Sequence, residues 1–322
     1  MKIGLVGIGG MGFVHFNSYK NIEDAQLVAV CDVDVETLNQ KTEGFDLNRY
    51  TDLDEMLANE ELDMVDICTP TYLHMEQVLK ALDKGVNVLC EKPMAMNSQE
   101  TKIILDKVEE TGKLYMVAHV IRFMANYKYL KSLIDTKKYG KLIRLDAKRI
   151  SSIPRWSWEN WFQDEKKSGL VVHDMVIHDI DFIQYTLGMP KDIVGAYYTL
   201  EGENNYGTAT YLYDGFSASV ETGWYNAEMP FMVEFFAVFE NGYLSLKDGK
   251  LVECGEEIDL EKSEVIEETE INVSSADGYT EEIRYFMDCI KKGEKPQLVE
   301  PESSALTIKL IEMTLDKMTK LN

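Results

Sequence analysis

The first 32 residues carry the feature that most limits the folds open to this chain. A short apolar strand predicted from Met1 to Gly7 runs directly into the series Gly7, Ile8, Gly9, Gly10, Met11 and Gly12, and a helical pattern follows. Gly7 permits a tight turn, Gly9 lets the backbone approach a pyrophosphate, and Gly12 lets helix and strand pack closely. The first N–H groups of the helix would bind the phosphates. This order of elements predicts a dinucleotide-binding turn.

The end of the second predicted strand indicates which dinucleotide would bind. That strand covers residues 26–31 and ends in Asp32, about 20 residues after Gly12, where a carboxylate that binds the ribose hydroxyls is expected. Residues 33–36 include two further acids, and no Lys or Arg occurs before Lys41. A 2′-phosphate would therefore meet carboxylates, so NAD is favoured over NADP as the cofactor.

Composition narrows the class of protein. At 322 residues the chain should hold about two domains. Asp and Glu outnumber Lys and Arg by 56 to 33, for a net charge of −23, and such a surface repels nucleic acid and anionic membranes. The five cysteines lack C-x-x-C spacing and are interpreted as free thiols. With no leader pattern and no long apolar run, we expect a cytoplasmic protein.

The alternation of elements predicts an α/β protein. Up to about residue 118, apolar strands at 64–68, 86–90 and 114–118 alternate with helical patterns, which is typical of a doubly wound parallel sheet. Strands at 142–150 and within 193–246 instead show period-two alternation and hairpin turn signals. We therefore predict a Rossmann domain over residues 1–118 and, over residues 119–322, an α+β domain with a large, mostly antiparallel open sheet.

The end of the chain is predicted to be helical. Helices are expected over 279–292 and 301–320, and the last of them could pack back on the first domain. The acidic stretch 253–270 is expected to be a solvated edge strand or loop.

One predicted helix carries groups capable of proton transfer. Within the apolar stretch 171–183, Asp174, His178 and Asp181 stand at i, i+4 and i+7, and so should form one polar stripe. A narrow stripe of Asp and His without Lys favours a cleft or polar pocket. The structural alternative is a buried histidine hydrogen-bonded to a carboxylate.

Two more polar segments follow parallel strands, at the sheet edge where open α/β sheets bind ligands. One contains Thr69, Pro70 and His74, and the other is Glu91-Lys92-Pro93. Lys92 follows an apolar strand and precedes a proline, which favours a fixed position over the solvated state that is usual for lysine.

Taken together, these segments resemble the Gfo/Idh/MocA family of oxidoreductases, which includes glucose-fructose oxidoreductase and inositol dehydrogenase. The resemblance covers essentially the whole chain, and the Glu91-Lys92-Pro93 segment with the downstream Asp174 and His178 carries most of it. It implies that Lys92 is the active-site lysine and that Asp174 and His178 form the acid/base pair. It also implies an open sheet that forms a dimer contact, and hence a homodimer or homotetramer.

The same resemblance, together with the positions of these residues at strand ends, implies which residues bind the substrate and which bind the cofactor. Arg122 and Tyr279 would face substrate together with Lys92, Asp174 and His178. The alternatives are a helix-terminal surface charge for Arg122 and a core aromatic for Tyr279. The cofactor-binding residues would be Gly7, Ile8, Gly9, Gly10, Met11, Gly12, Asp32, Thr69, Pro70, His74, Glu91 and Lys92.

These side chains suit the oxidation of a secondary alcohol, which needs a base, a donor to the developing alkoxide and a hydride acceptor. His178 could act as the base, Asp174 could fix its tautomer, and Lys92 could donate to the alkoxide. We therefore expect an NAD-dependent dehydrogenase of a sugar or cyclic polyol. Two alternatives stay open: a redox-neutral glycosidase that uses NAD, and a non-enzymatic ligand sensor. No metal site is expected, because the histidines lack ligand spacing.

The substrate is expected to be neutral and polyhydroxylated, with inositols and aldohexoses as first candidates, because few cations are available for an anionic group. The cluster Trp156, Trp158 and Trp161 could stack on a sugar ring, although core packing is the expected use of at least two of them. No partner is assigned to His15 or His119.

Overall fold

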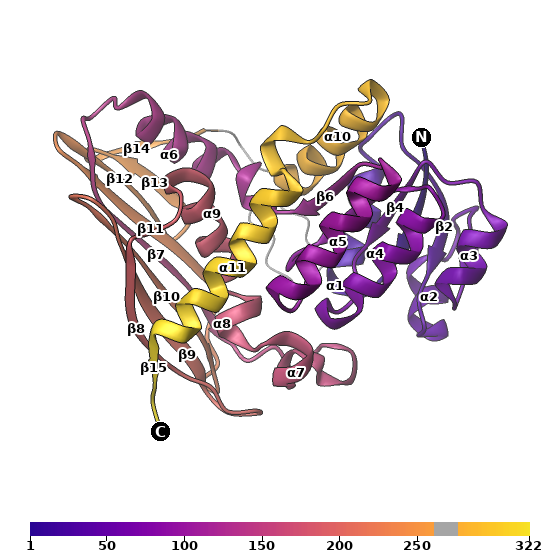
Figure 1. Cartoon of the computed structure of the whole chain (residues 1–322), viewed down its shortest axis with the longest axis horizontal. Helices are drawn as coiled ribbons and strands as arrows, with labels where there is room; N and C mark the ends of the chain where they lie inside the picture. The colour runs from indigo at the N-terminus through magenta and orange to yellow at the C-terminus, as the bar shows by residue number, and fades with distance from the viewer. Residues whose placement is uncertain (261–275) are drawn as a thin grey trace. The chain divides into compact units, whose positions relative to one another are not determined.

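The computed structural model describes residues 1–260 and 276–322. These form two compact units (Figure 1). Unit 1 consists of Met1–Val120 with the described part of Glu264–Ala305, and unit 2 consists of the described part of Ile121–Ser263 with Leu306–Asn322. Among the described residues, none of the helices has both the length and the apolar character needed to cross a bilayer.

Unit 1 is built on a six-stranded parallel sheet with the strand order β3-β2-β1-β4-β5-β6. Its strands are β1 (Lys2–Val6), β2 (Gln26–Cys31), β3 (Asn48–Tyr50), β4 (Met64–Ile67), β5 (Asn87–Glu91) and β6 (Tyr115–Ala118). The order reverses between β1 and β4, which makes this sheet a doubly wound fold with its ligand-binding crevice at the carboxyl ends of those strands. The predicted Rossmann fold is confirmed.

Helices cover both faces of this sheet, since right-handed crossovers on either side of the reversal place their helices on opposite faces. Those within the crossovers are α1 (Gly10–Tyr19), α2 (Val35–Lys41), α3 (Leu53–Asn59), α4 (His74–Asp83), with the 3₁₀ turn η1 (Thr71–Leu73) before it, and α5 (Ser98–Thr111). Leu5, Ile8, Phe16, Val30 and Leu38 form one buried cluster that joins β1, the glycine-rich turn, α1, β2 and α2.

Helix α10 (Ala276–Lys292) belongs to unit 1, in contrast to the single boundary predicted after residue 118. It packs against α1, and Lys291 forms an ion pair with Asp24 at 3.0 Å. The strongly amphipathic sequence of α10 shows that the helix has an apolar face, but only the tertiary structure selects α1 as its partner. The 3₁₀ turn η4 (Gln297–Val299) follows it.

Unit 2 is built on a nine-stranded sheet in the order β14-β13-β12-β11-β7-β10-β9-β8-β15. Its strands are β7 (Leu142–Ser152), β8 (Asp192–Tyr198), β9 (Asn205–Leu212), β10 (Ser217–Tyr225), β11 (Met232–Phe239), β12 (Gly242–Lys247), β13 (Lys250–Glu253), β14 (Glu256–Ile258) and β15 (Met318–Lys320). Only the β10–β7 and β15–β8 pairs are parallel, so the prediction of a mostly antiparallel sheet is confirmed.

The helices of unit 2 pack on one face of this sheet, as α9 and α11 show in Figure 1. Helices α8 and α9 contact β9, β10 and β7. In chain order the helical elements are the 3₁₀ turn η2 (Val120–Arg122) at the unit boundary, α6 (Ala125–Thr136), the 3₁₀ turn η3 (Trp158–Gln163), α7 (Glu165–Ser168), α8 (Val171–Asp174), α9 (Ile177–Leu187) and α11 (Pro301–Lys317), which begins in unit 1.

Two predictions about chain segments need correction or restriction. The last predicted helix was extended to residue 320, but α11 ends at Lys317, and Met318–Lys320 pair in parallel with β8. Backbone pairing with the sheet edge overrides local helix propensity there. The acidic stretch 253–270 begins in the edge hairpin of β13 and β14, while residues 261–270 lie outside the described residues.

Candidate active site

The glycine-rich turn joins β1 to α1 and fits a dinucleotide. Gly7 has φ +83°, and a Cβ there would lie 2.8 Å from the Cys68 carbonyl oxygen. A Cβ on Gly12 would lie 1.9 Å from the Gly7 carbonyl oxygen, so both positions require glycine. A Cβ on Gly9 would meet no protein atom within 4 Å, and no side chain caps α1, which starts at Gly10. The turn therefore leaves space and unpaired N–H groups where a pyrophosphate would bind.

Asp32 is fixed beside this turn by backbone groups. Its Oδ2 accepts from the Ile8 N–H at 2.7 Å, and its Oδ1 accepts from the Asp34 N–H at 2.8 Å. Each oxygen keeps a second lone pair, so the carboxylate can still accept a hydrogen bond from a ribose hydroxyl.

The structure adds Lys41 to this region, which sequence reasoning did not include. Its Nζ donates to the carbonyl oxygens of Ile8 and Gly9, at 3.0 and 3.1 Å, and lies 5.0 Å from the Phe13 ring centre. The signal in the sequence was the shortness of the predicted helix: α2 has seven residues, so a lysine in its last turn can reach back to the glycine-rich turn.

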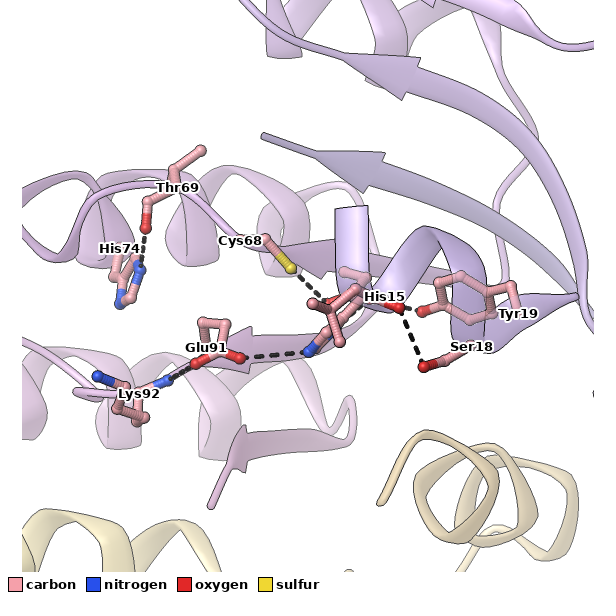
Figure 2. A network of polar contacts seen from close by, with 10 residues as sticks. His15, Ser18, Tyr19, Cys68, Thr69, His74, Glu91 and Lys92 are labelled. Carbon is pink, nitrogen blue, oxygen red and sulfur yellow. Dashed lines mark hydrogen bonds and ion pairs between the residues drawn. The ribbon is translucent and has the colours of Figure 1, made fainter. Parts of the chain in front are cut away.

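The segment after β4 is tied to the segment after β5. His74 lies between two carbonyl oxygens: its Nε2 is 2.8 Å from Thr69 O (Figure 2), and its Nδ1 is 2.7 Å from Pro93 O. Burial lowers the pKa of His74, although the two carbonyls favour the proton. Thr69 also donates from its hydroxyl to Gln77. His74 thus links Thr69-Pro70 to the Glu91-Lys92-Pro93 segment, and its cofactor contact stays a prediction.

Lys92 stands at the carboxyl end of β5, one residue beyond the strand. Its backbone N–H donates to Glu91 Oε2 at 2.9 Å (Figure 2), and the Lys92–Pro93 peptide bond is cis. The Lys92 side chain is half-buried, whereas Glu91 is buried. Lys92 is therefore anchored through its backbone and not loosely solvated.

The segment with Asp174 and His178 is not one helix. Helix α8 ends at Asp174, α9 starts at Ile177, and the Val176 N–H donates to the Val171 carbonyl five residues earlier, at 3.1 Å. The prediction of one continuous helix is wrong, because this widened turn interrupts the α-helical hydrogen-bond pattern. Asp174 is buried, and His178 is half-buried at the start of α9.

Leu170 holds the start of α8 in an uncommon conformation. Its φ of +57° is rare for a non-glycine residue, and its carbonyl accepts from the N–H groups of His173 and Asp174, at 3.1 and 2.8 Å. Backbone strain of this kind is often retained next to functional groups, and here it lies at the start of the short helix α8 that ends at Asp174.

Asp181 forms a buried ion pair with Arg122. It is fully buried and accepts from Arg122 through both oxygens, at 2.8 and 2.6 Å, and from the Thr307 hydroxyl at 2.9 Å. Arg122 is likewise buried, and its guanidinium lies 4.3 Å from the Tyr185 ring centre. The widened turn lies between Asp174 and both His178 and Asp181, so neither the i+4 nor the i+7 spacing from Asp174 is that of one continuous helix, whereas His178 and Asp181 lie three residues apart on α9. Arg122 and Asp181 therefore form a buried ion pair, which contradicts the alternative of a surface charge for Arg122, and a substrate contact of Arg122 stays a prediction.

Tyr279 lies on α10, within unit 1. Its ring centre is 6.1 Å from that of His15, and the residue is 9% exposed. The contact matches the alternative of a core aromatic, and a role toward substrate stays a prediction.

The expected core packing of the tryptophans is wrong. Trp156 and Trp158 are 48% and 51% exposed, and Trp161 is half-buried and stacks on Phe162 with ring centres 4.1 Å apart. The surrounding loop has positive φ at Glu159 and Asn160. This exposure leaves two indole faces accessible.

Sequence reasoning also gave no partner to His15. In unit 1 its Nδ1 lies 2.9 Å from Asp66 Oδ2, and the Cys68 thiol lies 3.5 Å from the other Asp66 oxygen. The donor atoms of these three residues lie within 4.8 Å of one another, a spacing that these hydrogen bonds explain. The available signal was an aspartate inside the apolar strand Met64–Ile67, which is costly unless paired.

Comparisons with known proteins place the chain in a family. Residues 1–119 match the model for the oxidoreductase family with an NAD-binding Rossmann fold, and residues 127–245 match the Gfo/Idh/MocA C-terminal domain. The scyllo-inositol 2-dehydrogenase (NADP(+)) of Bacillus subtilis is 30% identical over 226 residues, which are 68% of each chain. The chain belongs to the Gfo/Idh/MocA oxidoreductase family.

Other relatives share part of their length with this chain. The 2,7-anhydro-N-acetylneuraminate hydratase of Mediterraneibacter gnavus is 34% identical over 193 residues, which are 59% of this chain and 50% of that protein. The chain thus spans about half the length of several curated relatives that it matches. The structure of scyllo-inositol dehydrogenase from Lactobacillus casei with NAD(H) and scyllo-inositol has the same fold, with a TM-score of 0.80, 23% identity, and coverage of 99% of this chain and 96% of that one.

Proposed function

We propose that this protein is an NAD-dependent dehydrogenase that oxidises a secondary hydroxyl of a neutral sugar or cyclic polyol. The observation that carries the proposal is a glycine-rich turn with open space at Gly9 and a carboxylate at Asp32, in a chain of an oxidoreductase family that keeps Lys92, Asp174 and His178. A bound NAD would supply the hydride acceptor. Gly7 to Gly12 would hold its pyrophosphate, and Asp32 its adenosine ribose.

The protein's own groups would manage the proton and the oxygen. In this proposal His178 removes the hydroxyl proton, since imidazole titrates near neutral pH. Asp174 stabilises the resulting imidazolium, and Lys92 donates to the developing alkoxide. The backbone anchors already described, at Leu170 for α8 and at Glu91 for Lys92, support these roles because they limit movement of both groups.

A variant of His178 tests the assignment of the base. Replacement of His178 by Ala should lower kcat by roughly 10²-fold to 10⁴-fold, with NAD affinity nearly unchanged. Turnover is followed at the absorbance band of reduced nicotinamide, on a panel of inositols and aldohexoses. Thr186→Ala on the same helix is the matched control and should keep wild-type turnover. A His178→Ala enzyme of wild-type rate would return His178 to a structural role.

Two glycine variants test the cofactor site. Gly9→Ala should weaken NAD binding at least about tenfold, since its methyl group would occupy the space for the pyrophosphate. Gly12→Ala should lower the melting temperature more than Gly9→Ala does, because its methyl group would overlap the Gly7 carbonyl. Equal NAD affinity of Gly9→Ala and the wild type would exclude this binding mode.

We further propose that NAD is preferred over NADP by at least about tenfold, because a 2′-phosphate would approach Asp32 and Asp34. Lys41 is the one group described near this turn that could oppose the preference. The measurement is kcat/KM with each cofactor, in the wild type and in Lys41→Ala. Comparable values for the wild type would refute the preference.

A neutral substrate is supported by the state of the buried arginines. Arg122 is bonded to Asp181, and Arg149 donates to both oxygens of Asp179, at 2.9 and 3.0 Å. Both charges are thus compensated within the protein. A kcat/KM for a sugar phosphate well above that of every neutral polyol would contradict this part of the proposal.

The likeness to the anhydrosugar hydratase favours one second candidate, a redox-neutral reaction on a sugar. Such a reaction consumes substrate without net reduction of NAD. The loss of substrate is measured by chromatography, and the amount of reduced nicotinamide by its absorbance. Loss of substrate while this absorbance stays constant would favour the redox-neutral reaction over the dehydrogenase.

We also propose that the chain forms a homo-oligomer through the open face of the unit 2 sheet. Consecutive residues of its strands point to opposite faces of the sheet. Ile193 and Phe235 are buried on the helix-covered face, and Val194 and Phe236 are exposed on the other face. Light scattering should show a dimer or larger assembly, and Val194→Glu/Phe236→Glu should reduce its mass. Leu298→Glu, an exposed position in unit 1, is the control.

A further inference from the structure

Unit 1 buries a cluster of titratable side chains that the proposed reaction does not use. It brings together His15 from α1, Asp66 from β4, Glu91 from β5 and Glu282 from α10, with exposures of 0%, 0%, 5% and 0%. Tyr19, Cys68 and Tyr279 complete its surroundings. Burial of this many ionisable groups is costly unless they compensate one another.

His15 lies between two of the carboxylates. Its Nδ1 is 2.9 Å from Asp66 Oδ2, and its Nε2 is 3.2 Å from Glu91 Oε1 (Figure 2). The contact of Nδ1 is a hydrogen bond and that of Nε2 is an ion pair by distance, so a protonated imidazole, with an N–H at each ring nitrogen, would face a carboxylate on both sides. Tyr19 donates its hydroxyl to the same Asp66 oxygen at 2.7 Å, which holds that carboxylate from a second side.

The charges in the cluster follow from these contacts. Burial by itself lowers the pKa of His15, but the charge of Asp66 and the hydrogen bond to it outweigh burial and raise that pKa well above 6.5. Burial raises the pKa of Glu282 well above its ordinary value, and burial also raises that of the Cys68 thiol. At neutral pH these raised pKa values keep His15 as an imidazolium and Glu282 and Cys68 neutral.

The cluster connects directly to Lys92. While Glu91 Oε1 faces His15, its Oε2 accepts from the Lys92 backbone N–H at 2.9 Å. The Glu91 side chain thus bridges a fixed cation and the residue that follows β5. Without the imidazolium, the buried Glu91 side chain would lose this compensating charge and turn toward water. Such a movement would disturb its hydrogen bond with Lys92.

We propose that His15 is a positioning residue for Lys92: anchored by Asp66, it fixes the Glu91 carboxylate, and Glu91 in turn fixes the backbone of Lys92. The proposal rests on the function proposed above for Lys92. Misplacement of a reacting group by about 1 Å can cost about 100-fold in rate. Loss of His15 should therefore affect turnover although His15 itself is buried away from solvent.

The test compares His15→Gln, which removes the charge, with Tyr19→Phe, which removes another hydrogen bond to the same Asp66 oxygen but leaves the imidazole bridge. His15→Gln should lower kcat about 10-fold to 100-fold, with smaller changes in KM and in NAD affinity. Tyr19→Phe should keep kcat within about twofold of wild type. Equal losses of kcat in both variants would assign the cluster a structural role only and overturn the proposal.

A second readout does not depend on turnover. The rate at which acetic anhydride modifies Lys92 is measured by mass spectrometry, with Lys102 on the surface of α5 as the internal reference. The ratio of the two rates should change in His15→Gln and stay at the wild-type value in Tyr19→Phe. An unchanged ratio in His15→Gln would overturn the proposal, whereas a changed ratio in a protein without dehydrogenase activity would refute only the proposed function.

Glu91→Gln provides a variant with less risk to folding, because its amide oxygen can still accept from the Lys92 N–H. It should shift kcat and the Lys92 labelling ratio in the same direction as His15→Gln, by a smaller factor. Wild-type values of both measurements in Glu91→Gln would also overturn the proposal.

Discussion

The two units bury charge in different ways. In unit 2 the buried cations are arginines, Arg122 and Arg149, each bonded through two nitrogens to one aspartate. In unit 1 the central cation is His15, a group that can lose its proton, among carboxyl groups of which Glu282 is neutral. Arginine stays charged throughout the accessible pH range, whereas histidine does not. The difference indicates that unit 2 uses its ion pairs to fix its packing and that unit 1 keeps a cluster whose charge depends on pH.

The largest expected effect comes from breaking an arginine pair in unit 2. Asp179→Ala leaves Arg149 as a buried cation without its carboxylate, which should lower the free energy of unfolding by about 3–5 kcal/mol. Calorimetric or denaturant unfolding of the purified protein measures the loss. The control is Arg149→Met/Asp179→Leu, which removes both charges and should recover most of the stability. A loss of unfolding free energy below about 1 kcal/mol in Asp179→Ala would show that the buried charge of Arg149 does not depend on Asp179 for compensation.

A smaller loss of stability is expected when Arg149 loses its uncharged hydrogen-bond partner, Tyr127. Tyr127 OH accepts from Arg149 Nη2 at 3.2 Å inside unit 2. Tyr127→Phe should cost about 1–3 kcal/mol, the range for a hydrogen bond to a charged group. The same unfolding experiment applies, and Tyr185→Phe serves as the control. If the two variants are equally stable, the hydroxyl does not contribute to the cluster.

The next largest effect is the pH dependence of the stability of unit 1. The pKa values of His15 and Glu282 are both raised in the folded protein, so each group contributes stability below its unfolded value that is lost as pH rises through its folded value. We expect the melting temperature of unit 1 to fall by about 2–4 °C per kcal/mol lost as pH rises above 6.5. Glu282→Gln cannot ionise and should show a flatter dependence. A melting temperature of unit 1 that rises over this range would contradict the assigned protonation states.

The smallest effect belongs to a surface pair, which sets the scale for the buried ones. Lys102 donates to Asp106 on the exposed face of α5, at i and i+4. Lys102→Ala should change the free energy of unfolding by no more than about 0.5 kcal/mol, and added salt should reduce the difference. A loss comparable to that of Asp179→Ala would mean that burial does not explain the contrast between these pairs.

Local sequence signals were sufficient for the parallel sheet of unit 1 and its glycine-rich turn. The glycine positions, the strand that ends at Asp32 and the alternation of strands with helices all depend on contacts between neighbouring parts of the chain, so they predicted the turn, the sheet and its ligand edge. The same reasoning failed for the single helix predicted over 171–183, because a turn of five residues in place of four at Val176 interrupts it. It also missed Lys41 and His15, whose polar partners lie 32 or more residues away in sequence.

The sequence by itself determined the fold class of both units, the dinucleotide-binding turn and the candidate proton-transfer groups, because periodicity, glycine and proline positions and strand ends are local properties of a chain. Only the tertiary structure decided which charges neutralise one another: Arg122 with Asp181, Arg149 with Asp179, and His15 with Asp66 and Glu91. The physical reason is that a buried charge is stable only next to a compensating one, and the packing of helices on sheets selects that partner from distant parts of the chain.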